Sequence, residues 1–348
     1  MVSRKQYGGE DKMRDQEKMQ VVRIYEYGGP EKMQLEWLDI PEIGKDEVLV
    51  KVKFASVNFL DIQMRRGDLV KQKFYGKEAG FNNNLPITIG SQCMGVVEAV
   101  GENVDHLKPG DRVICGGVGT YATHVISSAK RMIPINIDIP DQQAAAGLTQ
   151  GFLAYAFTHK AYPIQKGEWC LIQAAAGGLG SLICQMAKLR GGKVIGVTSK
   201  EEKANFVLEA GADIVLISSQ ENIPERVREI TNGEGVRVVY DGVGKDTFDS
   251  NLNSLGLGGY LVMYGQSSGY VPPFDLMKLQ EQGSLFLTRT NGLPYMKYWP
   301  EYMENFQKWV ANDGFSIKID HVYPLKDVAK AHSKMEDRNS VGRILLKP

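Results

Sequence analysis

Apolar and polar residues alternate along the first third of the chain, and this alternation predicts short strands. In residues 47–57, EVLVKVKFASV, the pattern has the period of a half-buried strand. Two shorter strands are expected around the Gly28-Gly29-Pro30 turn, and more within 87–101 and 108–115. Short strands separated by glycine and proline turns favour a compact β-barrel.

The pattern changes at about residue 141, where Asp141 is expected to cap a helix. From Trp169 onward six apolar runs alternate with mostly helical segments, which predicts an α/β fold with a doubly wound parallel sheet. The tail from about residue 295 is expected to return to the first domain. We therefore expect one domain over 21–145 and 290–348, and a second over 146–289.

Composition and charge exclude several classes of protein. The chain has 348 residues, 43% of them hydrophobic and 24% charged, and its 41 Lys and Arg balance 41 Asp and Glu. This balance of charge argues against nucleic-acid binding. No apolar run is long enough to span a membrane. Residues 1–20 are polar, so we expect a disordered extension and not a secretion signal. The four scattered cysteines favour the reducing cytoplasm.

The segment WCLIQAAAGGLG, residues 169–180, carries the strongest chemical signal. It predicts a strand, a tight turn and a helix, with the pattern Ala175-x-Gly177-x-x-Gly180 at the turn. Gly177 would let a pyrophosphate approach the backbone, and Gly180 would let the helix pack close to the strand. The first helical amides would then face the phosphates. The alternative is an ordinary glycine-rich turn.

The end of the next strand bears on the choice of nicotinamide. An NAD site would place an acidic residue there, but the strand ends in Thr198, Ser199 and Lys200. Glu201 and Glu202 follow, and the spacing Ser199-x-x-Glu202 fits a capping box that would explain these glutamates.

No metal site is expected from the sequence. His106, His124 and His159 lack thiolate or carboxylate partners at ligand spacing, so scattered structural histidines are the favoured interpretation.

Several motifs together carry a family resemblance that covers nearly all of residues 20–348. The chain resembles zinc-independent quinone oxidoreductases of the zeta-crystallin type, in the medium-chain dehydrogenase/reductase superfamily. The resemblance implies a GroES-like β-barrel substrate domain, a Rossmann cofactor domain and NADPH. The matching motifs are NFLDIQMRRG (58–67), PGDRV, AAAGLT (144–149), AAAGGLGSLICQMAK, DGVG (241–244), YGQSSG (264–269) and SLFLTR (284–289).

The resemblance also implies the residues of the cofactor site. Lys203, one helical turn after Ser199, matches the lysine that contacts the 2′-phosphate, and Arg338 is a second candidate for it. Thr149 is expected on the nicotinamide side, and Gly265 and Leu287 beside its carboxamide. The implied cofactor-binding set is Asn58, Thr149, Ala175, Ala176, Gly177, Gly178, Leu179, Gly180, Thr198, Ser199, Lys203, Val243, Gly265, Leu287 and Arg338.

On the substrate side the resemblance is less complete. Asn58 is the candidate hydrogen-bond donor for catalysis, and Asp61 is expected to brace the loop rather than to act in catalysis. Two pocket tyrosines of the family have no direct counterpart, and Gln63 and Tyr75 are taken as pocket residues. Asn58 stands where zinc-dependent relatives have a cysteine, and GSQCMG (90–95) replaces their Gly-His-Glu segment. The resemblance therefore implies a reaction without metal.

The predicted function is reduction of a small-molecule quinone by NADPH. A quinone suits a site with no evident acid, because its reduced anion can take protons from water. An enoyl or alkenal double-bond reductase is the nearest alternative. A crystallin-like or RNA-binding protein that retains a cofactor site is an alternative from another class. The strand GSLFLT is an expected sheet edge, which together with the family's habit predicts a homodimer.

Overall fold

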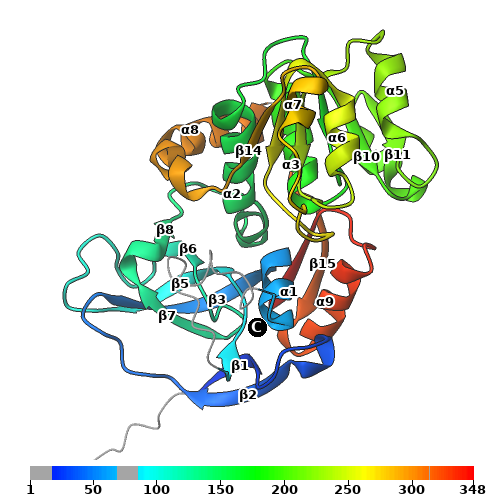
Figure 1. Cartoon of the computed structure of the whole chain (residues 1–348). Helices are drawn as coiled ribbons and strands as arrows, with labels where there is room; N and C mark the ends of the chain where they lie inside the picture. The colour runs from blue at the N-terminus through cyan, green and yellow to red at the C-terminus, as the bar shows by residue number, and fades with distance from the viewer. Residues whose placement is uncertain (1–17, 69–84, 313) are drawn as a thin grey trace, which may run out of the picture.

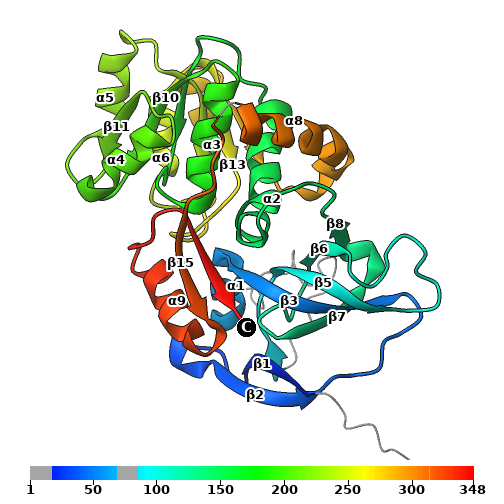
Figure 2. The same cartoon turned by 180° about the vertical axis from the view of Figure 1, so that it is seen from behind.

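The computed structural model describes residues 18–68, 85–312 and 314–348, and these form two lobes (Figures 1 and 2). One lobe holds two mainly antiparallel sheets and both ends of the described chain. The other lobe holds a parallel sheet with helices on its two faces. This arrangement is the expected α/β fold, a β-barrel lobe combined with a doubly wound parallel sheet.

The barrel lobe contains a seven-stranded sheet in the order β15-β16-β3-β5-β6-β8, with β7 also paired to β3, and a three-stranded sheet in the order β2-β1-β4. The strand expected over 47–57 is β3, Glu47–Val57, in which Val48, Val50 and Val52 are buried while Lys51 and Lys53 are exposed. The other strands are β1 (Lys18–Ile24), β2 (Gln34–Asp39), β4 (Ile87–Thr88), β5 (Gln92–Val100), β6 (Arg112–Gly116), β7 (His124–Ser128), β8 (Met132–Pro134), β15 (Ile319–Pro324) and β16 (Arg343–Lys347).

Two helices cover this lobe: α1 (Phe59–Arg66) follows β3, and α9 (Val328–Glu336) precedes β16. Short 3-10 helices span Pro30–Lys32, Ala129–Arg131 and Leu325–Asp327. Strand β1 begins at Lys18, so the last three residues of the expected N-terminal extension belong to a strand, and residues 1–17 lie outside the described residues.

The second lobe contains a six-stranded parallel sheet in the order β11-β10-β9-β12-β13-β14. Its strands are β9 (Trp169–Ile172), β10 (Lys193–Thr198), β11 (Ile214–Ile217), β12 (Val236–Asp241), β13 (Leu255–Met263) and β14 (Phe286–Arg289). The chain runs outward from β9 in one direction and returns to β12 on its other side. This reversal creates a crevice at the carboxyl ends of β9 and β12, where doubly wound sheets bind ligands.

Helices pack on both faces of this sheet because its central strands are apolar on both sides. In β9, Cys170 and Ile172 face the core shared with α2 and α3, while Leu171 faces the core shared with α5 and α6. The helices are α2 (Asp141–Tyr155), α3 (Gly178–Leu189), α4 (Ala204–Glu209), α5 (Ile223–Ile230), α6 (Phe248–Ser254), α7 (Met277–Glu281) and α8 (Trp299–Asn312). A π-helix over Ala156–Ala161 extends α2, and 3-10 helices span Glu201–Lys203 and Leu293–Tyr298.

The C-terminal segment divides between the two lobes. Helix α8 lies beside α2 in both views, and the Tyr302 ring is 5.6 Å from the Phe152 ring. Only β15, α9 and β16 join the barrel lobe, where β16 pairs with β3. The domain limits that the sequence suggests, at 145/146 and 289/290, stay predictions.

The expected cap of α2 is wrong. Pro140 occupies the N-cap position and Asp141 is the first helical residue. The Asp141 carboxylate instead accepts a hydrogen bond from Arg112 Nε at 3.1 Å and forms an ion pair with Nη2 at 2.9 Å. A long-range ion pair has replaced the local cap.

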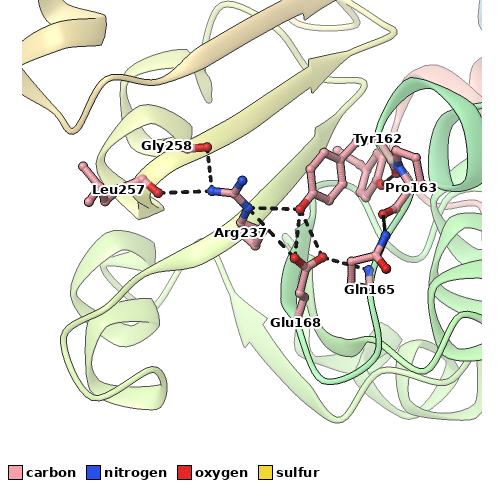
Figure 3. Close-up of polar contacts among 8 residues, drawn as sticks. Tyr162, Pro163, Gln165, Glu168, Arg237, Leu257 and Gly258 are labelled. Atoms are coloured by element: carbon pink, nitrogen blue, oxygen red, sulfur yellow. Dashed lines mark hydrogen bonds and ion pairs between the residues drawn. The ribbon is translucent and has the colours of Figure 1, made fainter.

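Arg237 organises a polar cluster at the amino-terminal end of the parallel sheet (Figure 3). Its Nη1 donates to the carbonyl oxygens of Leu257 at 3.2 Å and Gly258 at 2.7 Å. Its Nε donates to the Tyr162 hydroxyl at 3.1 Å, and that hydroxyl donates to Glu168 at 3.0 Å. These hydrogen bonds connect β12 at this end of the sheet to β13 and to the segment before β9.

Candidate functional site

The glycine-rich turn lies at the carboxyl end of β9, at the crevice between the two halves of the sheet. Ala174 has φ +50°, and Gly177 is the N-cap of α3. A Cβ at Gly180 would lie 2.3 Å from the Ala174 carbonyl oxygen, so only glycine fits there. The close packing expected of Gly180 is therefore present.

The start of α3 offers free backbone donors. The Ser181 amide donates to the Gly177 carbonyl at 3.0 Å, which closes the first turn of the helix. The amides of Gly178, Leu179 and Gly180 come before this bond and have no carbonyl partner within the helix. Together with the positive end of the helix dipole, these amides suit a diphosphate. The expected cofactor residues Ala175 and Ala176 are buried in the same turn.

The C-terminal segment reaches this turn from the barrel lobe. Gly342 forms a bridge with Gly177, and its amide donates to the Ala176 carbonyl at 3.0 Å. In Figures 1 and 2 the red C-terminal strands run up to the lower end of α3. The next residue, Arg343, is only 6% exposed and lies against Gly178. Arg343 was not expected at the site, although an arginine that opens the apolar run RILL was a usable signal.

Asn58 lies on the barrel side of the same junction, as the N-cap of α1. Its Oδ1 accepts hydrogen bonds from Arg343 Nη2 at 2.8 Å and from Gln150 Nε2 at 3.3 Å. Its Nδ2 donates to the Ser91 hydroxyl at 3.2 Å. Since the amide oxygen has two donors, the amide can offer only its second N–H to another molecule.

Asp61 is fully buried behind Asn58 and braces its loop, as expected. Its Oδ2 accepts hydrogen bonds from the backbone N–H of Asn58 at 2.8 Å and from the Tyr121 hydroxyl at 2.9 Å. Burial raises the pKa of Asp61 to about 6, although the donors around it favour the carboxylate. Tyr121 also contacts His332 Nε2 at 3.2 Å, which links α1 to α9. Neither Tyr121 nor His332 was expected at the site.

The residues expected at the 2′-phosphate lie at the end of β10 and in the loop after α9. Thr198 is buried, Ser199 is half-buried and Arg338 is exposed, with φ +55°. Lys203 is only 7% exposed, and its ammonium donates to the carbonyls of Arg338 and Ser340, at 2.5 and 2.9 Å. Burial lowers the pKa of Lys203. The lysine therefore ties the loop that carries Arg338 to the lobe of the parallel sheet.

The capping box expected from Ser199 and Glu202 is wrong. Lys200 occupies the N-cap position of the 3-10 helix, and no side chain makes a cap hydrogen bond there. The Glu202 carboxylate instead pairs with Lys200 at 3.7 Å.

The remaining expected cofactor residues occupy the ends of the other strands and α2. Val243 follows β12, and its amide donates to Asp241 Oδ1 at 2.7 Å. Gly265 follows β13, where a Cβ would lie 2.4 Å from the Gly242 carbonyl oxygen. Leu287 is half-buried in β14, and Thr149 is half-buried in α2.

Of the two residues expected in the substrate pocket, the structure describes only Gln63. Gln63 is half-buried on α1, five residues after Asn58 along the same loop and helix. Tyr75 lies outside the described residues.

Titratable residues do not gather into a metal-binding group within the described part of the chain. His159 stacks on Tyr155 with ring centres 4.5 Å apart, and burial, helped by Arg190 and Lys160, lowers its pKa to about 3. Among the described residues, no helix is both long and apolar enough to cross a membrane.

Two family models match the chain. Residues 44–138 match the alcohol dehydrogenase GroES-like domain, and residues 178–308 match a model described as zinc-binding dehydrogenase. The chain is 35% identical to quinone oxidoreductase 1 of Escherichia coli, over 94% of this chain and 99% of that protein. It is 32% identical to a 2-haloacrylate reductase of Burkholderia, over 93% and 98%.

Solved structures of quinone oxidoreductases are also similar to this chain. The Escherichia coli quinone oxidoreductase complexed with NADPH superposes with a TM-score of 0.86 at 33% identity, and covers 94% of this chain and 100% of that one. The expected fold and family resemblance are thereby confirmed. The chain belongs to the quinone oxidoreductase family of the medium-chain dehydrogenase/reductase superfamily.

Proposed function

We propose that this protein reduces quinones with NADPH by hydride transfer and without a metal ion. One observation carries the proposal: the free amides at the start of α3 and the donor amide of Asn58 meet at one junction, with Arg343 between them. A relative with this fold that was solved with NADPH, and relatives named quinone oxidoreductases, support it.

The chain supplies binding and orientation. When bound, NADPH supplies a hydride from nicotinamide C4. The Gly178–Gly180 amides hold the diphosphate, while Lys203 and Arg338 take the 2′-phosphate. Thr149, Val243, Gly265 and Leu287 line the nicotinamide end of the crevice. Asn58 donates its free N–H to a quinone oxygen, where negative charge develops during hydride transfer.

A reaction without metal agrees with the residues at the barrel side of the crevice. Asn58 contacts Ser91, Gln150 and Arg343, which are not zinc ligands in proteins. The quinone needs no Lewis acid or protein acid, because its reduced anion is stabilised and takes protons from water.

A second candidate is reduction of an activated carbon–carbon double bond. The similarity to a 2-haloacrylate reductase, at 32% identity, favours this alternative specifically. The cofactor residues would be unchanged, and only the pocket around Asn58, Gln63 and Tyr75 would select the acceptor.

The two acceptors can be compared directly. NADPH oxidation is followed in chelator-treated protein with an ortho-quinone and an α,β-unsaturated ketone, side by side. Turnover with the quinone is the expected result. Preference for the enone would favour the second candidate, and loss of activity with chelator that zinc restores would contradict the metal-free reaction.

We also propose a homodimer in which two parallel sheets join across β14. In the described chain β14 pairs only with β13, so its other edge is unpaired, and Phe286 in this strand is 53% exposed. An unpaired apolar edge strand favours pairing with another chain. Phe286→Glu should shift sedimentation toward monomer, whereas Leu208→Glu, an exposed position on α4, should not. A monomeric wild-type protein at micromolar concentration would refute the dimer.

The cytoplasmic location stays a prediction.

A further inference from the structure

Arg343 is a buried cation without a matching anion. It forms no ion pair within the described residues, and its two hydrogen bonds go to neutral oxygens, of Ala146 at 3.0 Å and of Asn58 at 2.8 Å. Asp61 acts on it only through its electrostatic field, and burial lowers the pKa of Arg343 to about 10. The guanidinium therefore remains charged at neutral pH, at a cost that a bound anion would offset.

The free end of this guanidinium lies at the start of α3. A Cβ built on Gly178 would be 2.4 Å from Arg343 Cδ and 3.1 Å from Nη1, so Gly178 leaves room for the arginine. Nη1 has no hydrogen-bond partner among the described residues, yet it is not one of the fully buried unpartnered atoms. Nη1 is thus an accessible donor beside Gly178, the first residue of α3.

The other end of the guanidinium sets the orientation of Asn58. Nη2 and Gln150 both donate to Oδ1, so the amide is held with its oxygen turned toward the arginine. A rotated amide would place two N–H donors against the guanidinium. This contact fixes Asn58 as a donor toward the substrate.

We propose that Arg343 joins the two halves of the site: its Nη1 end binds the diphosphate of NADPH, and its Nη2 end holds the amide oxygen of Asn58. This inference rests on the proposed function. One planar group then couples the cofactor-binding turn of one lobe to the reaction side of the other. An anion at Nη1 restrains the guanidinium, and thereby restrains Asn58 as well.

The test compares two probes. Binding of NADPH and of adenosine 2′-monophosphate, which lacks the diphosphate, is measured by calorimetry or competition. Arg343→Gln should weaken NADPH binding about 10–100-fold, the range expected for a charge-assisted hydrogen bond to phosphate, and leave the monophosphate unchanged. Arg237→Gln is the matched control at the opposite end of the sheet, and it should alter neither.

Turnover tests the second contact. Arg343→Lys keeps the positive charge but cannot contact the diphosphate and Asn58 at the same time. Its dissociation constant for NADPH should stay within a few-fold of the wild-type value, while its kcat should fall as much as that of Asn58→Ala. The double variant Asn58→Ala/Arg343→Lys should be no slower than Asn58→Ala. Thermal unfolding checks that each variant is folded. If Arg343→Gln does not fold, the kinetic comparison with Arg343→Lys tests the inference.

Several results would overturn the inference. Wild-type protein that binds NADPH, together with a folded Arg343→Gln variant that binds it equally well, would remove the diphosphate contact. Equal weakening of both probes would indicate general damage to the site. An Arg343→Lys variant with unchanged kcat, or independent effects in the double variant, would remove the link to Asn58. Wild-type protein that fails to bind NADPH would instead overturn the proposed function and this inference with it.

Discussion

An arginine lies at each end of the parallel sheet, but only one of the two has an anionic partner among the described residues. Arg237 of β12 pairs with Glu168 at 4.0 Å, whereas Arg343 of β16 reaches the other end from the barrel lobe and forms no such pair. At the amino end, Arg237 donates to two carbonyls and a hydroxyl (Figure 3). It also lies 5.4 Å above the Tyr260 ring. At the carboxyl end, Arg343 is more deeply buried and retains an unpartnered Nη1 in the described structure. A cation that is paired with a carboxylate of the protein indicates a structural role, whereas a buried cation without such a pair favours a site for an anionic ligand.

The same contrast separates the backbones of the two ends. At the amino end, the carbonyls of Leu257 and Gly258 accept hydrogen bonds from Arg237. At the carboxyl end, the amides of Gly178–Gly180 have no intrahelical acceptor. The following predictions test this contrast, from the largest expected effect to the smallest.

Asn58→Ala should give the largest loss of turnover, because it removes the donor that faces the acceptor oxygen. We expect kcat to fall about 100-fold, the effect of removing one such donor in other enzymes, with little change in NADPH binding. Steady-state kinetics with an ortho-quinone measure both quantities. Unchanged kcat would place the polarising group elsewhere.

Lys203→Ala should raise the Michaelis constant for NADPH about 10–100-fold and leave that for NADH nearly unchanged. The ammonium would contact the 2′-phosphate, and it also holds the loop that carries Arg338. Lys188→Ala, which removes a surface ion pair to Asp213, is the control. Equal effects on both cofactors would contradict a role at the 2′-phosphate.

His332 should make stability depend on pH. Burial and the nearby Arg65 lower its pKa from 6.5 to about 3 in the folded protein, so between these values the unfolded chain binds a proton that the native one does not. As the pH is lowered from 6.5 to about 3, the free energy of unfolding should therefore decrease, by up to about 1.4 kcal/mol per pH unit for this residue.

The variant His332→Asn isolates this contribution. Asp61 and His159 also titrate in this range, Asp61 with the opposite sign because its pKa is raised, and both are retained in the variant. Urea unfolding of both proteins at several pH values should show a shallower decline for His332→Asn. Parallel curves would mean that His332 ionises normally in the folded protein.

Arg237→Gln should reduce stability without affecting function. Loss of its hydrogen bonds should lower the free energy of unfolding by about 1–2 kcal/mol, since the side chain is partly exposed. Kinetic constants should equal those of the wild type. Impaired NADPH binding with normal stability would show that the amino end also serves the cofactor.

The strands and the glycine turn could be predicted from the sequence because their signals are local. The alternation in Glu47–Val57 gave the bounds of β3, and the pattern Ala175-x-Gly177-x-x-Gly180 located the start of α3. Capping was less predictable. Asp141 pairs with Arg112 and Glu202 with Lys200, because ion pairs competed with the local hydrogen bonds that a cap requires.

The junction between the lobes could not be predicted from the sequence. Asn58 and Arg343 are 285 residues apart, and only the pairing of β16 with β3 brings them together. Tyr121 meets Asp61 and His332 in the same way, through contacts that no spacing in the sequence encodes. The part of the site that holds Asn58 was therefore visible only in the folded chain.

NADPH binding to Gly180→Val tests the central claim most directly, with Gly258→Val at the amino end of the sheet as control. A side chain at Gly180 would lie 2.3 Å from the Ala174 carbonyl, and one at Gly258 would approach only Arg237 Nη1, at 3.3 Å, though at φ +64°. If the carboxyl end binds the cofactor, folded Gly180→Val loses NADPH binding, while folded Gly258→Val binds as the wild type does. Normal NADPH binding by folded Gly180→Val would contradict the assignment.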